Sequence, residues 1–250
     1  MNKVTKTLLA IAAGIITLGA VSCKKDDTLY YNNMTMGNVY DGRFVSDKGN
    51  IFNVVEQTCE GKLDTMKRAN VICDILNETQ GAKNEYDVRL TNLATVLTKS
   101  PITSADASTG DAAVKDPINI RELWYSGGYL NMYVQVPVKM DSKVKHLINL
   151  VYSTDDKGNH VFELRHNAFG ELRNDQDPKI YLGGCHVSFP ILDIIKKDSA
   201  KLNIKWKWYE AAGYAWSNNL KEYSFEYDWK REGYEQVPHT LALKSSAELK

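Results

Sequence analysis

Apolar and polar residues alternate along most of this chain with the period of two that is typical of β-strands. The clearest case is the segment His160–His166, in which Phe162 and Leu164 share one face and charged side chains share the other. After the first 22 residues no segment sustains the 3.6-residue period of a long helix, and only residues 191–197 predict a short helical turn. The pattern therefore predicts an all-β protein.

The first group of predicted strands is short and closely spaced. The segment Asp47–Asn50 contains the Gly and Asn that a hairpin turn requires. The five predicted strands are residues 39–46, 51–56, 69–76, 85–90 and 94–99. Because a small sheet hides its edges best when it closes, this group predicts a five-stranded OB-like barrel over residues 38–100.

Residues 101–116 separate this barrel from a second group of strands. They are mostly Ser, Thr, Ala, Asp and Gly, a composition that predicts an exposed linker between domains. The strands predicted after the linker are residues 118–125, 129–139, 144–152, 160–166, 184–190, 201–210 and 221–229. The pairs Gly127–Gly128 and Gly183–Gly184 predict tight turns or bulges. This spacing predicts an antiparallel β-sandwich over residues 117–235.

Residues 1–22 have the organisation of a secretory signal peptide, with basic residues before an apolar run and small residues at its end. The apolar run has about 14 residues, fewer than the roughly 17 to 25 of a membrane-spanning helix. Cys23 follows directly, which resembles the lipidation site of bacterial lipoproteins, although Ala20 stands where Leu is usual. A cleaved signal without lipid and a transmembrane helix are the alternatives.

The residues that follow the cysteine carry a second address signal. Lys24, Lys25, Asp26 and Asp27 resemble the export tag that routes some Gram-negative lipoproteins to the cell surface. The alternative is a solvated, charged linker. We expect residues 23–37 to form a lipidated tether and the protein to be an outer-membrane lipoprotein, at the periplasmic face or the cell surface.

Charge and cysteine content narrow the possible functions. Without the signal peptide the chain has 29 basic and 31 acidic residues, because the signal removes two of the 31 Lys and Arg and none of the 31 Asp and Glu. A net charge of −2 with scattered charges excludes a nucleic-acid partner bound by electrostatics. Cys59, Cys73 and Cys185 remain. In an oxidising compartment a Cys59–Cys73 disulfide is one alternative. The favoured alternative is that Cys73 is a buried free thiol.

Candidate groups for catalysis or metal binding are weak. His160 and His166 would share one face of a strand about 20 Å apart, too far to hold one ion, and nothing in the sequence places His146 or His186 beside either of them. No nucleophile elbow, phosphate-binding loop or zinc-ligand spacing occurs. We therefore predict no catalytic residue, no metal site and no cofactor.

The aromatic residues near the C-terminus are the remaining candidates for ligand binding. Trp206 and Trp208 alternate with two lysines, so we expect the tryptophans in the sandwich core and the lysines and Tyr209 in water. A glycan-stacking surface is the alternative. Residues 211–219 predict a loop with Tyr214 and Trp216 among Gly, Ser and Asn, and this loop is the better ligand-binding candidate.

Several stretches resemble one family, the NigD-like lipoproteins. They are GRFVSDKGNIFNVVE, LWYSGGYLNMYVQV, HVFELRHNAFGE and VSFPI, and the resemblance extends over nearly the whole mature chain. It implies an OB-type barrel followed by a β-sandwich and a proposed role in bacteriocin immunity. It implies no catalytic residues.

Together these observations predict a non-enzymatic cell-envelope lipoprotein that binds a partner, with bacteriocin immunity as one form of that role. A surface glycan-binding lipoprotein is the first alternative. A hydrolase with an unrecognised site is the second.

Overall fold

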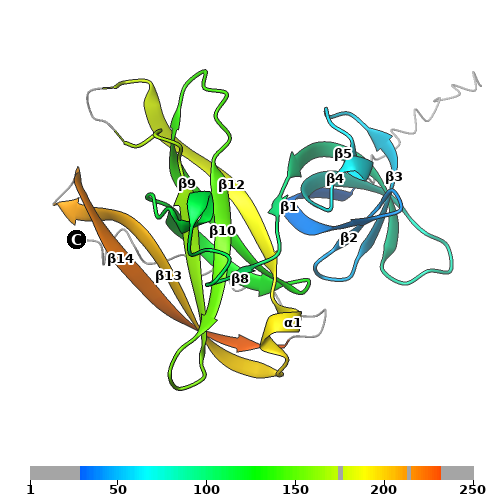
Figure 1. Cartoon of the computed structure of the whole chain (residues 1–250). Coiled ribbons are helices and arrows are strands. Elements are labelled where there is room, and N and C mark those ends of the chain that lie inside the picture. Colours follow the sequence, from blue (N-terminus) through cyan, green and yellow to red (C-terminus); the bar gives the residue numbers. More distant parts are fainter. Residues whose placement is uncertain (1–28, 174–176, 213–214, 232–250) are drawn as a thin grey trace, which may run out of the picture.

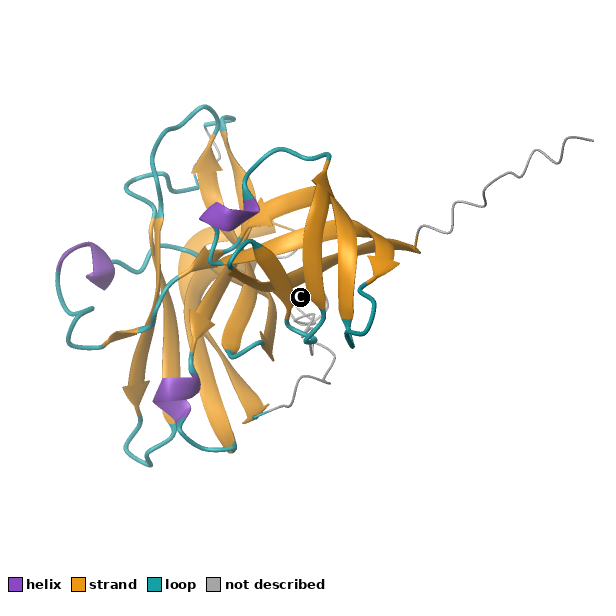
Figure 2. Cartoon of the chain, turned by 90° about the vertical axis from the view of Figure 1, so that its right-hand side faces the viewer, coloured by secondary structure: helices purple, strands orange, loops and turns teal. Residues whose placement is uncertain are grey.

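A closed barrel and a two-sheet sandwich lie side by side in the computed structural model, which describes residues 29–173, 177–212 and 215–231 (Figure 1). Strands dominate, and Figure 2 shows how few helical turns interrupt them. These turns are η1 (Leu63–Thr65), η2 (Gly110–Ala113) and α1 (Leu192–Ile195), the last of which confirms the turn predicted near residue 191. The protein is all-β, as its alternation predicts.

The barrel contains five strands in the order β1-β2-β3-β5-β4, and β4 returns to pair with β1. The strands are β1 (Leu29–Tyr40), β2 (Arg43–Ser46), β3 (Ile51–Gln57), β4 (Arg68–Glu78) and β5 (Glu85–Thr95). Phe44, Phe52, Val88 and Leu90 fill the interior. Burial of these side chains stabilises the barrel by roughly 1.5 to 3 kcal/mol each.

The five strands are not the five that the sequence predicts. β1 begins at Leu29, inside the predicted tether 23–37, and pairs with β4 from Leu29 opposite Ile75 onward. The tether prediction is therefore wrong from residue 29, because backbone pairing with β4 needs no apolar run in the partner. The strands predicted at 85–90 and 94–99 merge into β5, and the residues that follow form β6, which joins the sandwich.

The sandwich consists of a five-stranded sheet, β14-β13-β11-β10-β7, and a four-stranded sheet, β6-β12-β9-β8. Its strands are β6 (Leu97–Thr98), β7 (Ile102–Thr103), β8 (Asn119–Ser126), β9 (Tyr129–Lys139), β10 (Leu147–Thr154), β11 (His160–Asn167), β12 (Ile180–Pro190), β13 (Ser199–Ala212) and β14 (Ala215–Lys230). Four neighbouring pairs are antiparallel, and three are parallel: β7 with β10, β6 with β12, and β11 with β13. Trp206 and Trp208 are 6% and 2% exposed, which confirms their place in the core.

The segment 101–116 is docked on the sandwich and does not form the exposed linker that its composition predicts. β7 pairs with β10, and Ala107 is buried. The Arg165 guanidinium donates a hydrogen bond to the Ala107 carbonyl at 2.7 Å. The segment needs few large apolar side chains, because hydrogen bonds from its backbone to β10 and β11 hold it on the sandwich.

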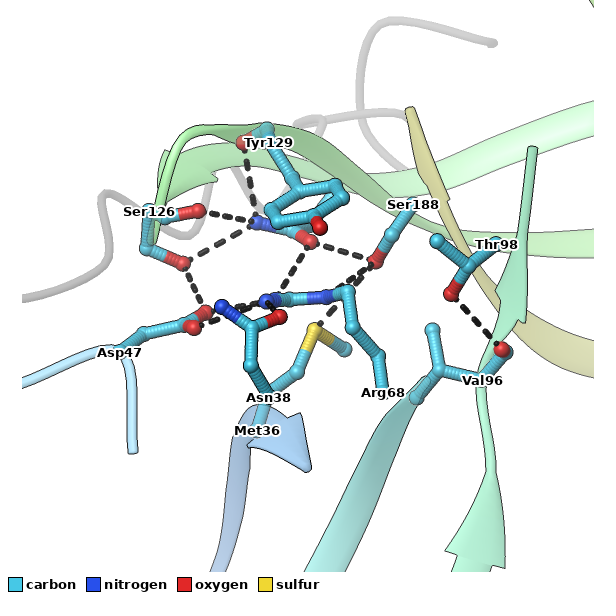
Figure 3. A network of polar contacts seen from close by, with 10 residues as sticks. Met36, Asn38, Asp47, Arg68, Val96, Thr98, Ser126, Tyr129 and Ser188 are labelled. Atoms are coloured by element: carbon cyan, nitrogen blue, oxygen red, sulfur yellow. Dashed lines mark hydrogen bonds and ion pairs between the residues drawn. The ribbon is translucent and has the colours of Figure 1, made fainter. Parts of the chain in front are cut away.

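A buried arginine joins the barrel to the sandwich (Figure 3). Arg68, at the start of β4, is 0% exposed, and all five of its N–H bonds point at acceptors. The acceptors are Asp47 (two bonds, 3.0 and 2.8 Å) and Asn38 (2.7 Å) of the barrel, and Ser188 (3.2 Å) and Asn131 (3.1 Å) of the sandwich. A buried cation with no unpaired donor is the arrangement that offsets its desolvation best.

The other members of this network close it on the sandwich side. The Ser126 hydroxyl donates to Asp47 at 2.6 Å, and the Asn131 amide donates to the Ser126 hydroxyl at 3.0 Å. The Tyr129 ring covers the guanidinium at 4.1 Å. We call Asp47, Arg68, Ser126, Asn131 and Ser188 the clasp.

Candidate functional site at the end of the sandwich

Two chain crossings lie next to each other at the end of the sandwich that the clasp does not occupy. Lys139, where β9 ends, pairs with Ile180, where β12 begins. Leu147, where β10 begins, pairs with Asn167, where β11 ends. The chain therefore passes between the two sheets twice at this end, which is the upper end of the sandwich in Figure 1. We call residues 140–146 and 168–173 the crossover face.

A chain of buried polar side chains connects the two crossings. His146 Nε2 lies 3.1 Å from Glu171 Oε2, and His146 Nδ1 lies 3.0 Å from His166 Nε2. The Ser142 hydroxyl and the Lys139 backbone N–H donate to the same carboxylate. His166 and Glu171 are 1% and 8% exposed, so this relay lies beneath the surface.

The partners of His166 indicate which of its ring nitrogens carries the proton. His166 Nδ1 lies 2.9 Å from the Pro117 carbonyl, which only accepts, so Nδ1 carries a proton. In neutral His166, Nε2 then accepts a hydrogen bond from His146 Nδ1. The His146 ring thus lies between His166 and the Glu171 carboxylate.

The pKa shifts of the two outer groups agree with this assignment. Burial, assisted by the nearby His146, lowers the pKa of His166 to about 4. The Ser142 hydroxyl bond, followed by those of the Lys139 N–H and His146, holds the pKa of Glu171 below its usual value. Neutral His166 and charged Glu171 therefore coexist at neutral pH.

The order of groups in the relay does not suit nucleophilic catalysis. The Ser142 hydroxyl donates to Glu171, and His146 lies on the far side of that carboxylate. In a Ser–His–acid triad the imidazole lies next to the serine hydroxyl and the carboxylate lies behind the imidazole, which is the reverse of this order. Within the described residues, no group of three or more His, Cys, Asp and Glu side chains could hold a metal ion. The relay can instead hold the two crossings together.

Exposed apolar residues are frequent at this end of the sandwich. Eleven large hydrophobic residues are exposed among the described residues, and six of them lie at this end of the sandwich. The six are Met140 (54%), Val144 (45%), Phe169 (48%), Leu172 (41%), Tyr181 (53%) and Leu182 (41%). Exposed apolar residues grouped on loops mark an interaction surface more often than scattered ones do.

Most site residues predicted from the sequence lie outside the described residues. This holds for Cys23, Lys24, Lys25, Asp26, Asp27 and Tyr214. Trp216 belongs to β14, where it pairs with Ala211 of β13. The loop predicted over residues 211–219 is therefore mostly a strand hairpin, and that prediction is wrong in its secondary structure.

The structure also corrects the prediction that Tyr209 faces water. Tyr209 is 4% exposed, because Arg173 lies over its ring at 5.7 Å and the Arg173 N–H donates to its hydroxyl at 3.0 Å. These contacts come from the second crossing, which no sequence pattern near Tyr209 indicates.

The approach of His146 to His166 is likewise invisible in the sequence. His146 precedes β10 and His166 lies near the end of β11, and only the pairing of these strands brings the rings together. Two other acidic side chains pair with basic residues elsewhere: the Glu163 carboxylate contacts Lys115 and Arg165, and Asp177 pairs with Lys139.

Cysteines and helices add no further site. Cys59, Cys73 and Cys185 are free thiols, and burial raises the pKa of Cys73 to about 11. In the part of the chain that the structure describes, no helix is long and apolar enough to cross a bilayer.

Comparisons with known proteins agree with this architecture. The family model of the NigD-like C-terminal beta sandwich domain matches residues 100–227. A search of curated proteins finds no relative. A NigD-like immunity protein from Bacteroides caccae is similar to the chain at 18% identity and a TM-score of 0.54, over 80% of this chain and 96% of that one.

Two further solved structures have the same fold. A protein of unknown function from Bacteroides vulgatus has 19% identity and a TM-score of 0.54, over 82% of this chain and 92% of that one. A Bacteroides fragilis protein that is described as a proposed lipoprotein has 14% identity and a TM-score of 0.53, over 79% of this chain and 98% of that one. At these identities the similarity shows the fold alone.

Proposed function

Since the chain belongs to the family that shares the NigD-like C-terminal β-sandwich domain, we propose that it is a non-enzymatic lipoprotein of the Gram-negative envelope that binds a partner. Cys23 carries the lipid in this proposal, and residues 24–27 direct the protein outward. Binding takes place at the crossover face. Bacteriocin immunity is one form of this role, and the name of the Bacteroides caccae protein supports it.

One observation carries the proposal: among the described residues, six of the eleven exposed large hydrophobic side chains lie at one end of the sandwich, four of them on the crossings that the buried relay connects and two in β12 beside them. Between 41% and 54% of each of these residues stays in water, so folding buries only part of their apolar surface. A rigid apolar surface that folding does not require is suited to recognition.

The Ser142 hydroxyl donates to the Glu171 carboxylate and His146 lies beyond that carboxylate, so the relay does not have the Ser–His–acid order of serine hydrolases. The glycan-binding alternative loses its strand platform, since Trp206 and Trp208 are buried. It retains only Tyr214 and Trp216. Retention of the protein on a glycan array, lost on Trp216→Ala, would bring this alternative back.

Membrane attachment is tested with Cys23→Ala in the native cells. We expect the variant to leave the membrane fraction after a salt wash, while the wild type stays, because two or three acyl chains supply the attachment. A variant that remains in the membrane fraction would contradict the lipid anchor.

Binding at the crossover face is tested by placing a photo-reactive amino acid at position 140 in the anchored protein. We expect a cross-linked product with another macromolecule. The matched control is the same amino acid at Val55, which is 57% exposed on the barrel. Equal products from both positions, or none from position 140, would contradict binding at this face.

A further inference from the structure

We infer that the crossover face binds a protein whose surface is acidic around an apolar centre, with Phe169 as the main anchor on this side. This inference rests on the proposed function, because it names the partner of the same face. Three independent features carry it: the turn that holds Phe169, the charges around the apolar residues, and the position of the face relative to the lipid anchor.

Phe169 is held outward by a turn that costs free energy. Its φ is +48°, in the left-handed region, where a bulky side chain is disfavoured by roughly 1 to 2 kcal/mol. The Phe169 N–H donates to Asn167 Oδ1 at 2.9 Å, and the Ala168 N–H donates to Asp116 Oδ2 at 2.8 Å. The ring is nevertheless 48% exposed. A strained, hydrogen-bonded backbone that presents an aromatic ring to solvent points to a use of that ring outside the fold.

Two residues after Phe169, hydrogen bonds of Glu171 hold the second crossing in place a second time. The Glu171 N–H donates to the Ala168 carbonyl at 3.0 Å, and the Glu171 side chain is buried in the relay with His146. Phe169 and Leu172 therefore stand on either side of an anchored residue. Pre-organised aromatic and aliphatic side chains form binding hot spots at low entropic cost.

Basic residues alternate with the apolar ones along the chain at this end: Lys143 and Lys145 flank Val144, and Lys179 comes two residues before Tyr181. Lys143, Lys145 and Lys179 are exposed, and among the described residues none of them has a carboxylate within ion-pair distance. Asp141 is the one exposed acid in the described parts of residues 139–146 and 168–182, since Glu171 is buried and Asp177 is half-buried beside Lys139. A positive rim around an apolar centre is complementary to a partner with the opposite rim.

The described chain begins on the other side of the molecule, and in the proposed function the lipid precedes this point in the sequence. Leu29, where the described chain begins, pairs with Ile75, whereas Asn38, at the far end of β1, pairs with Arg68 in the clasp. The chain thus enters the barrel on the side away from the sandwich (Figure 1). The crossover face lies past the clasp, at the end of β9. This position favours a protein partner over the membrane that holds the anchor.

The test uses the full anchored chain with the photo-reactive amino acid at position 140, so that Phe169 stays intact. Phe169→Asn keeps a residue that tolerates left-handed backbone, and we expect it to lower the cross-linked yield by more than roughly tenfold. Reversal of three lysines, Lys143→Glu, Lys145→Glu and Lys179→Glu, should lower it at least about tenfold. Sequencing the linked fragment should identify a protein segment rich in Asp and Glu.

A matched control reverses three lysines of the barrel, Lys48→Glu, Lys62→Glu and Lys83→Glu, and should leave the yield unchanged. A cross-linked yield that changes neither with Phe169→Asn nor with the three lysine reversals in the sandwich would overturn the inference. A lipid, a glycan or a second copy of this chain as the cross-linked partner would also overturn it. In each of these cases binding at the face itself would stand, whereas no product from position 140 would refute the proposed function first.

Discussion

The clasp and the crossover relay are both buried polar clusters, and they lie at opposite ends of strand β9. Asn131 of the clasp and Lys139 of the crossover end are eight residues apart in the strand, or roughly 25 Å. The clasp is built on an arginine, which stays charged at every physiological pH. The relay contains two histidines, and burial lowers the pKa of one of them, His166, to about 4.

The clasp and the relay also differ in what they support. The clasp fixes the barrel to the sandwich, and its side chains are at least nine-tenths buried. The relay fixes two crossings whose outer side chains remain in water. A permanent charge suits a joint that must not open, whereas a titratable pair makes the stability of the crossover face depend on pH.

The largest expected effect is on the clasp. Arg68→Met leaves the Asp47 carboxylate buried without its cation, and removal of one partner of a buried ion pair costs about 3 to 5 kcal/mol. We expect the free energy of unfolding in urea to fall by that amount. The control is Arg89→Met at a half-exposed pair with Glu56, which should cost under about 1 kcal/mol. Similar losses in both variants would mean that the clasp is an ordinary surface pair.

The second prediction concerns the relay and acid. The pKa of His166 is about 4 in the folded protein and about 6.5 in the unfolded chain, so the unfolded chain alone gains this proton between those values. The free energy of unfolding should therefore fall as the pH falls from 6.5 to 4, by up to roughly 3 kcal/mol, with no further change from this group below pH 4. The lowered pKa of Glu171 acts in the same direction.

Urea unfolding of wild type and His166→Gln between pH 4 and pH 7.5 measures this contribution. The variant is expected to be less stable at pH 7.5 but to lose less stability on acidification. His160 and His186 also have lowered pKa values through burial, and they stay in both proteins, so the difference between the curves isolates the relay. Parallel curves would show that His166 does not titrate in this way.

The third prediction separates close contact from backbone strain at the clasp. Gly127 and Gly158 both have positive φ, +59° and +79°, but a Cβ at Gly127 would lie 2.2 Å from Asp47 Oδ1, whereas one at Gly158 would meet nothing within 4 Å. Gly158→Ala should cost about 1 kcal/mol from strain alone. Gly127→Ala should cost about 1 to 3 kcal/mol more, because the ion pair must shift. Equal thermal midpoints would show that the turn yields without disturbing Asp47.

The fold was predictable where the alternation of apolar and polar side chains shows which face of a sheet is buried, and where glycines mark the turns. Phe162 and Leu164 alternate with charged residues and are buried, and the glycines at 49 and 158 have the positive φ that their hairpins require. β1 was not predictable, because its pairing with β4 uses backbone groups that any sequence offers. The segment around Ala107 was also missed, since it is held by Arg165 from a distant strand.

The candidate site was harder to predict from the sequence than the fold, for a physical reason. Each member of the relay looks like an ordinary polar residue in its own segment, and only the pairing of β10 with β11 makes His146 and His166 neighbours. Arg68 is similar, since five acceptors from distant strands turn a strand-end arginine into a fully buried cation. Sequence spacing predicts elements, but contacts between elements require the topology.

The smallest expected effect is on Phe169, and its small size is what makes it informative. Phe169→Asn removes a ring that is half in water and places a residue that tolerates left-handed backbone, so the lost contacts and the relieved strain should nearly cancel. We expect a change within about 0.5 kcal/mol in urea unfolding. The same substitution at Phe162, which is buried in the core, should cost more than about 3 kcal/mol. A loss above about 2 kcal/mol at Phe169 would assign the ring to the stability of the crossing. A negligible loss would leave recognition as its role, and would separate the crossover face from the clasp, where every side chain serves the fold.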